Sequence, residues 1–221
     1  MSAQGGEMVR QLRLQWDAAT LATRWTGIGA LLAARAERIG ALKRGNFTLV
    51  SGERSSIYFD GRMLTLDPEG SALLGGTLLQ LLRLRGIAAC AGPAAGAIPI
   101  VGAITALSAA WRDPDAAAAP VRGLFTRSAT KDHGTRKQVE GTLEPGLSVG
   151  VVEDTVTSGG SLLRAVEALQ QQGCKVELAA AILDRGGKVA QPLSEMGIPF
   201  HPLLRLDGDG ELRPQQLELP A

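Results

Sequence analysis

The fold is decided by the stretch Val149-Gly-Val-Val-Glu153-Asp154-Thr-Val-Thr-Ser-Gly-Gly-Ser161. An apolar run ends in two adjacent carboxylates, and a short loop of Thr, Ser and Gly follows before a helical pattern opens at Leu162. The run is typical of a buried parallel strand. The acids stand at its carboxyl end, where open α/β sheets bind ligands. Free backbone N–H groups at a helix N-terminus suit a phosphate, so the stretch indicates a sugar-phosphate ligand.

Each of these features alone also fits an ordinary N-cap or turn. The strand–loop–helix order favours the phosphate site, because that is the context in which such loops bind phosphate.

Strand and helix patterns alternate through the rest of the chain. Residues 1–16 are expected to be loosely ordered. Residues 17–43 have helical spacing that fits one helix, or two helices broken near Gly27 and Gly29, with an end at Gly45. Strands are predicted over 47–50, 57–64, 87–91, 121–126, 176–183 and 199–206, and helices over 68–85, 97–111, 162–173 and 188–196. Asp67 is the expected N-cap of the 68–85 helix, and Pro68 its expected first residue. This order predicts one α/β domain with a mostly parallel sheet and helices on both faces.

Composition excludes several classes of partner. The 221 residues carry a net charge of +1 and few aromatic side chains, which argues against a nucleic-acid surface. No apolar run is long enough to span a bilayer. Cys90 and Cys174 lie in apolar surroundings and have no metal or CxxC spacing, which predicts buried reduced thiols. We therefore expect a soluble cytoplasmic protein.

The segment 127–146 is polar and rich in Gly, Thr and cations. It fits a solvated surface loop, but beside a sugar-phosphate site it also fits a lid whose Lys131 and His133 neutralise a leaving polyanion. His133 could also donate a proton near neutral pH, whereas His201 is expected to be structural. No metal-cage spacing is present, so Mg²⁺ is expected to arrive with the phosphates of the substrate.

The residues from Val151 to Ser161 resemble the phosphoribosyl-diphosphate (PRPP) signature of type I phosphoribosyltransferases. Three further segments are similar to the orotate phosphoribosyltransferase family: residues 51–60 with Arg62, residues 131–141, and Asp184-Arg185. The resemblance covers roughly residues 42–206 in consistent order. It implies the type I fold with a PRPP-binding core over 68–185, an N-terminal helical extension over 1–45, a flexible catalytic loop over 127–146, and a small hood formed by N- and C-terminal segments.

The resemblance also implies roles for single residues. Glu153 and Asp154 would hold the ribose hydroxyls, and the loop of Ala94 to Gly96, where the superfamily often has a non-proline cis peptide, would touch pyrophosphate. The implied PRPP-binding residues are Arg54, Ala95, Gly96, Arg127, Ser128, Lys131, His133, Glu153, Asp154, Thr155, Val156, Thr157, Ser158, Gly159, Gly160 and Ser161. The implied catalytic residues are Lys131, Asp132, His133, Glu153 and Asp154. The implied orotate contacts are Tyr58, Phe59, Thr157 and Arg185.

The implied reaction joins orotate to the phosphoribosyl group of PRPP and releases pyrophosphate, with Mg²⁺, in a homodimer whose catalytic loop reaches the neighbouring subunit. Three positions depart from the usual pattern: Arg54 replaces a Lys, Ser128 replaces a Lys, and Gly96 replaces a Lys of some members. Two alternatives therefore stay open, a phosphoribosyltransferase for another base and a PRPP-sensing regulator with weakened turnover.

Overall fold

The structure is a computed structural model that describes residues 1–48, 54–111, 119–127 and 138–219. The first half of the chain contains α1 (Ala3–Gln11), α2 (Ala18–Arg38), β1 (Leu42–Thr48), β2 (Arg54–Phe59), α3 (Gly61–Thr65), α4 (Pro68–Leu84), β3 (Ala89–Pro93) and α5 (Ile98–Ala110). The second half contains β4 (Arg122–Thr126), β5 (Val139–Glu140), β6 (Ser148–Val156), α6 (Gly160–Gln171), β7 (Lys175–Asp184), α7 (Ala190–Glu195), β8 (Phe200–Leu206) and β9 (Leu212–Pro214).

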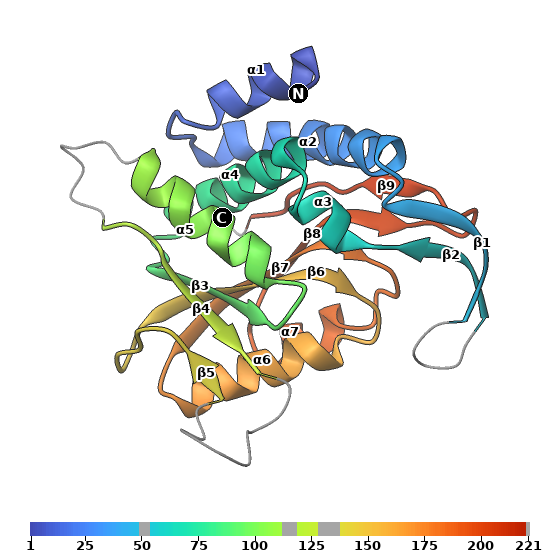
Figure 1. Cartoon of the computed structure of the whole chain (residues 1–221). Helices are drawn as coiled ribbons and strands as arrows, with labels where there is room; N and C mark the ends of the chain where they lie inside the picture. The colour runs from blue at the N-terminus through green and yellow to red at the C-terminus, as the bar shows by residue number, and fades with distance from the viewer. Residues whose placement is uncertain (49–53, 112–118, 128–137, 220–221) are drawn as a thin grey trace.

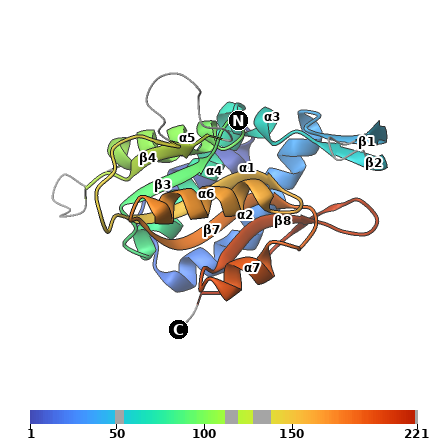
Figure 2. The ribbon, with the colours of Figure 1, turned by 90° about the horizontal axis from the view of Figure 1, so that it is seen from below.

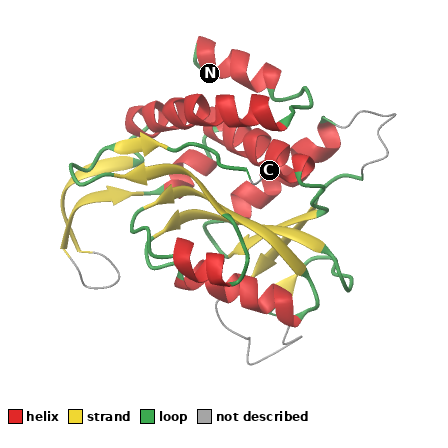
Figure 3. Ribbon diagram, turned by 180° about the vertical axis from the view of Figure 1, so that it is seen from behind, coloured by secondary structure: helices red, strands yellow, loops and turns green. Residues whose placement is uncertain are grey.

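A seven-stranded sheet forms the centre of the molecule in the order β5-β4-β3-β6-β7-β8-β9. Its five inner strands are parallel, and β5 and β9 pair antiparallel at the two edges. Helices α2, α4 and α5 cover one face, while α6 and α7 cover the other (Figures 1 and 3). Each face has its own apolar core. This architecture confirms the predicted fold class, and it brings the carboxyl ends of β3, β6 and β7 to one edge.

A two-stranded antiparallel sheet of β1 and β2 projects beside that edge (Figure 2). The C-terminal turn between β8 and β9 packs on this small sheet. Arg44 pairs with Glu211 at 2.6 Å, and Gly210 lies directly against Ile57. The hood predicted from N- and C-terminal segments is thus present among the described residues.

The N-terminal predictions need three corrections. Residues 1–16 are not loosely ordered, since α1 forms there and Ser2 donates its backbone N–H to the buried Glu69 carboxylate at 2.9 Å. Helix α2 runs unbroken through both of its interior glycines and ends before Gly40, whose φ of 73° makes it the terminating glycine in place of Gly45. The helical spacing predicted over 17–43 includes Leu42 and Lys43, which instead begin β1.

Four further boundaries differ from those predicted. The expected strand 57–64 ends at Phe59, because Asp60 caps α3 by accepting the Arg62 N–H. The segment 127–146, expected to lack regular structure, contains β5. Helix α6 begins at Gly160, two residues before the predicted start. The tail after residue 206 forms β9.

Other local predictions agree with the structure. Asp67 caps α4 with Pro68 at its first position, and Cys90 and Cys174 are buried and unbridged. Within the described residues, no helix is both long and apolar enough to cross a bilayer.

Candidate active site

The acid pair lies near the end of β6, at the carboxyl edge of the sheet. Glu153 is paired with Ala181 of β7 and is only 5% exposed. The strand continues to Val156, so the two acids lie within its last four residues, at the carboxyl end that the sequence pattern predicted. Ser161, at the start of α6, donates its hydroxyl to Oε2 of Glu153 at 2.9 Å. This bond joins the predicted sugar-binding acid to the predicted phosphate loop.

Both carboxyl groups resist ionisation. Burial, and after it the neighbouring charge of Asp154, raise the pKa of Glu153 to about 8, while the Ser161 hydrogen bond acts in the opposite direction. Burial also raises the pKa of Asp154, although the Thr155 backbone N–H donates to its Oδ1 at 2.7 Å. Two adjacent buried carboxylates repel each other, so the pair is ready to receive positive charge or hydroxyl donors.

Asp154 lies next to two segments that are distant in sequence. A β-carbon at Gly96, in the turn after β3, would lie 2.5 Å from its Oδ1. A β-carbon at Gly61, the first residue of α3, would lie 2.9 Å from its Cβ. The Ala94–Ala95 peptide in the same turn is cis, as the resemblance implied. The structure thus brings together the predicted sugar-binding and pyrophosphate-binding segments.

The loop between β6 and α6 has the backbone of an anion cradle. Gly159 precedes α6 with a φ of 81°, and a β-carbon there would lie 2.6 Å from Cβ of Val189. Only glycine suits that position. Thr157 and Ser158 are exposed, Val156 is buried, and the Thr155 hydroxyl is enclosed without a hydrogen-bond partner among the described residues. The first backbone N–H groups of α6 therefore face an accessible loop.

The end of β7 supplies the next part of the site. Asp184 is 1% exposed and accepts the Gly187 N–H at 2.8 Å and the Arg205 Nε–H at 3.1 Å. These bonds fix the turn that carries Arg185. The Arg185 guanidinium donates through Nη2 to the Ile57 carbonyl at 3.3 Å, which places it against β2 of the hood.

Of the three hood residues with predicted roles, Tyr58 and Arg54 have accessible side chains and Phe59 is buried. Tyr58 is partly exposed and its ring centroid lies 5.6 Å from that of Phe47. Phe59 is 5% exposed and packs in the main core, so its side chain supports the fold instead of facing the site. Arg54 begins β2 and its side chain is exposed.

The base of the predicted lid is closed by β4 and β5. Arg127 donates its backbone N–H to Gln138 and its Nε–H to Glu140 at 2.9 Å, and its guanidinium lies 5.5 Å from the Phe125 ring centroid. Ser128, Lys131, Asp132 and His133 lie outside the described residues.

Comparisons with known proteins agree on one family. The chain is 40% identical over 169 residues to the orotate phosphoribosyltransferase of Rhodopirellula baltica, an alignment that covers 74% of this chain and 84% of the relative. It is 36% identical over 160 residues to the Aquifex aeolicus enzyme of the same name, covering 72% and 84%. The chain belongs to the orotate phosphoribosyltransferase family.

Solved structures support the same assignment. The Mycobacterium tuberculosis orotate phosphoribosyltransferase in complex with PRPP matches with a TM-score of 0.63 and 30% identity, over 81% of this chain and 96% of that chain. The Aeropyrum pernix orotate phosphoribosyltransferase matches with a TM-score of 0.62 and 32% identity, over 79% and 93%. No protein-family model matches the chain. The matches to solved structures show that the fold is that of the type I phosphoribosyltransferases.

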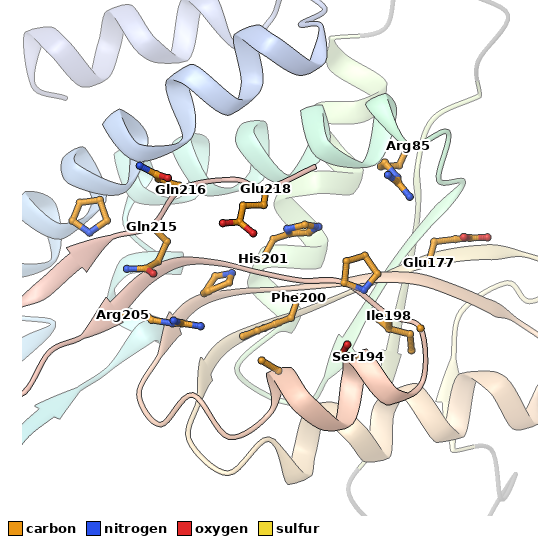
Figure 4. Close-up of a pocket in the computed structure, with 15 residues that line it drawn as sticks. Arg85, Glu177, Ser194, Ile198, Phe200, His201, Arg205, Gln215, Gln216 and Glu218 are labelled. Atoms are coloured by element: carbon orange, nitrogen blue, oxygen red, sulfur yellow. The ribbon is translucent and has the colours of Figure 1, made fainter. Parts of the chain in front are cut away.

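A pocket of about 900 Å³ lies away from this site, beside the amino-terminal half of β8 (Figure 4). It contains His201, which is 7% exposed and whose pKa is lowered to about 4 by burial and by the charge of Arg85. Two cationic residues, Arg85 and Arg205, and two anionic residues, Glu177 and Glu218, line the pocket. These charges sum to zero, so the lining does not favour a ligand of either charge. His201 is buried, as the sequence suggested.

Sequence analysis missed two glycines that shape the family site. Gly61 borders Asp154, and a β-carbon at Gly186 would lie 2.6 Å from the Thr157 carbonyl oxygen. The available signals were local: Gly61 follows the Asp that ends β2, and Gly186 follows Asp184-Arg185. A close approach between segments distant in sequence has no signature in either segment.

Proposed function

We propose that this chain transfers the 5-phosphoribosyl group of PRPP to orotate, giving orotidine 5'-phosphate and pyrophosphate, as a cytoplasmic step of pyrimidine synthesis. The observation that carries the proposal is the convergence of the Glu153–Asp154 pair, the 157–161 loop and Arg185 at one edge of the sheet. The reaction itself follows from the chain's membership of the orotate phosphoribosyltransferase family.

The 157–161 loop binds the 5-phosphate through backbone N–H groups at the start of α6. Glu153 and Asp154 then lie beside the ribose, where carboxylates accept hydrogen bonds from its hydroxyls. The bond from the anomeric carbon to pyrophosphate breaks, and the leaving group takes the bonding pair. Positive charge develops on the sugar ring, and nearby carboxylates favour that state. A ring nitrogen of orotate then bonds to the anomeric carbon and loses its proton, which the released pyrophosphate takes up.

Arg185 is suited to the orotate carboxylate, because a guanidinium binds a carboxylate with two parallel hydrogen bonds. Its contact with Ile57 sets it against the hood, next to Tyr58. Thr157 lies beside the turn that carries Arg185, because a β-carbon on Gly186 would lie 2.6 Å from the Thr157 carbonyl oxygen. Phe59 takes part through its backbone, since its side chain is in the core.

Mg²⁺ fits this donor set as a cation carried mainly by the substrate. Among the described residues, no three His, Cys, Asp or Glu side chains are grouped to hold a metal. Phosphate oxygens of the substrate and water would be its ligands. When bound, it neutralises charge on the departing pyrophosphate.

The active unit we propose is a homodimer whose 127–146 loop closes over the neighbouring site with Lys131, Asp132 and His133. Three exposed apolar side chains support a second copy next to the site: Met63 on α3 is 37% exposed, Leu66 at the C-cap of α3 is 71% exposed, and Ile98 on α5 is 40% exposed. The pairing of β4 with β5 holds Thr126 next to Val139 at the base of this segment. The remaining PRPP contacts come from Arg54, Arg127 and Ser128. The division into 1–45, 68–185 and 127–146 stays a prediction.

The test is the fall of orotate's ultraviolet absorbance with purified protein, PRPP and Mg²⁺. We expect turnover that depends on PRPP and collapses in Lys131→Ala. Lys175→Ala is the matched control, because Lys175 is exposed at the amino end of β7. Absence of turnover with PRPP still binding in calorimetry would refute orotate transfer and favour another base or a PRPP sensor.

A further inference from the structure

The turn that carries Arg185 is built around one carboxylate, that of Asp184. Its Oδ1 accepts the backbone N–H of Gly187 at 2.8 Å and that of Gly186 at 3.2 Å, which closes the chain directly after Arg185. On the preceding side, the Arg185 backbone N–H donates to the Val156 carbonyl at 2.8 Å. The backbone of Arg185 is therefore held from both sides, and one of the two anchors is a side chain.

The second oxygen of that carboxylate is held by a residue from another strand. Arg205 lies opposite Asp184 in the pairing of β7 with β8, and its Nε–H donates to Oδ2 of Asp184 at 3.1 Å. The Asp184 side chain is 0% exposed, and Arg205 is the cation that pairs with it in the described part of the chain. A buried carboxylate that loses its cation keeps an uncompensated charge. Removing Arg205 should therefore disturb Asp184 and both N–H bonds of the turn.

This turn packs against the hood and against the phosphate loop. The Arg185 guanidinium donates to the Ile57 carbonyl at 3.3 Å, and a β-carbon on Gly186 would lie 2.6 Å from the Thr157 carbonyl oxygen. A guanidinium binds a carboxylate with two parallel hydrogen bonds only in a defined orientation. A small shift of the turn backbone should therefore weaken the binding of a carboxylate by Arg185.

We propose that Arg205 is a positioning residue for Arg185, acting through Asp184 to hold the guanidinium in the orientation that binds the carboxylate of orotate. The inference rests on the proposed function and adds a residue to it. Arg205 acts from a distance, since it also lines the pocket of about 900 Å³ that lies away from the active site (Figure 4). Its side chain is 47% exposed, so its truncation opens no sealed cavity in the core.

The experiment compares two arginine-to-alanine variants that each remove one ion pair. Arg205→Ala removes the pair with buried Asp184. Arg122→Ala is the matched control, because Arg122 pairs with Glu144 at a similar distance of 2.9 Å but that carboxylate is 56% exposed. We expect the KM for orotate to rise about tenfold in Arg205→Ala and less than about twofold in Arg122→Ala. The KM for PRPP should change less than about twofold in both variants, because the phosphate loop is held by α6.

A rise of both KM values by the same factor in Arg205→Ala, or no rise in either, would overturn the proposal. A double-mutant cycle adds a second criterion. In an Arg185→Ala background there is no guanidinium to orient, so Arg205→Ala should change the KM for orotate by less than about twofold. A further loss as large as that in the wild-type background would show that Arg205 does not act through Arg185. If Arg205→Ala does not fold, Arg205→Gln, which keeps an N–H donor without the charge, carries the same comparison.

A further readout does not need turnover. The Gly187 amide is protected from hydrogen exchange by its bond to Asp184. In ligand-free protein this amide should exchange faster in Arg205→Ala than in wild type, and at the wild-type rate in Arg122→Ala, as measured by NMR. Unchanged exchange in Arg205→Ala would refute the hold of Arg205 on the turn. If the wild-type protein shows no turnover with orotate, the proposed function fails, and the exchange rates still decide whether Arg205 holds the turn.

Discussion

Glu153→Gln should make the protein more stable at alkaline pH, with little effect at acid pH. The side chain is 5% exposed, and its pKa is raised from 4.5 to about 8, mainly by burial. Between these two values the unfolded chain releases the proton while the folded chain keeps it. The free energy of unfolding therefore falls as pH rises from 4.5 to about 8 and is constant for this group outside that window.

The size of the effect follows from the same two values. One pKa unit corresponds to about 1.4 kcal/mol. Glu153→Gln should therefore be more stable than wild type by on the order of 5 kcal/mol at pH 8.5. At pH 7 only part of the interval between the two pKa values has been crossed, so the stabilisation should be on the order of 3 kcal/mol. Glutamine keeps the shape and can still accept the Ser161 hydrogen bond, so it removes the charge and little else.

Guanidinium unfolding of the ligand-free protein at pH 5, 7 and 8.5 measures the difference. Lowered carboxyl pKa values elsewhere, such as those of Asp67 and Asp60, affect wild type and variant equally and cancel. Glu167→Gln is the matched control, since Glu167 is exposed on α6. A Glu153→Gln stabilisation that is the same at pH 5 and pH 8.5 would refute the reasoning, because an uncharged packing effect does not depend on pH.

Three further predictions concern the phosphate loop and the lid. Ser161→Ala removes the hydrogen bond that lowers the pKa of Glu153, so the rising limb of kcat/KM against pH should move to higher pH; an unmoved limb would count against this contact. Gly159→Ala combines a φ of 81° with a clash against Val189 and should lower the free energy of unfolding by about 1–3 kcal/mol, measured by denaturant titration, whereas no loss would mean that the loop relaxes freely. Ser128→Lys should raise kcat/KM by restoring a cation near pyrophosphate, and an unchanged or lower value would contradict that role.

Sequence patterns succeeded where neighbours along the chain determine structure. The apolar run before Glu153 predicted β6 because a strand buried on both faces needs continuous apolar residues. Asp67-Pro68 predicted the start of α4 because capping involves residues within one turn. The same reasoning failed at residues 1–16, where Ser2 caps α1 and also hydrogen-bonds Glu69, 67 positions away.

Hydrophobic alternation also misplaced the end of β2. Residues 57–64 are apolar enough for a strand, but Asp60 caps a helix and Leu64 packs beneath it in the core. β9 was missed because a short edge strand is stabilised by pairing with β8 and has little pattern of its own.

By itself the sequence determined the strand–loop–helix unit that carries Glu153 to Ser161, the order of strands and helices, and the family to which the chain belongs. These depend on local periodicity and on motifs of adjacent residues. Only the tertiary structure decided where Asp154 lies, because Gly61 and Gly96 approach it from segments that are 93 and 58 positions away along the chain. It also decided the ionisation of the acid pair, since burial depends on everything that packs around a side chain.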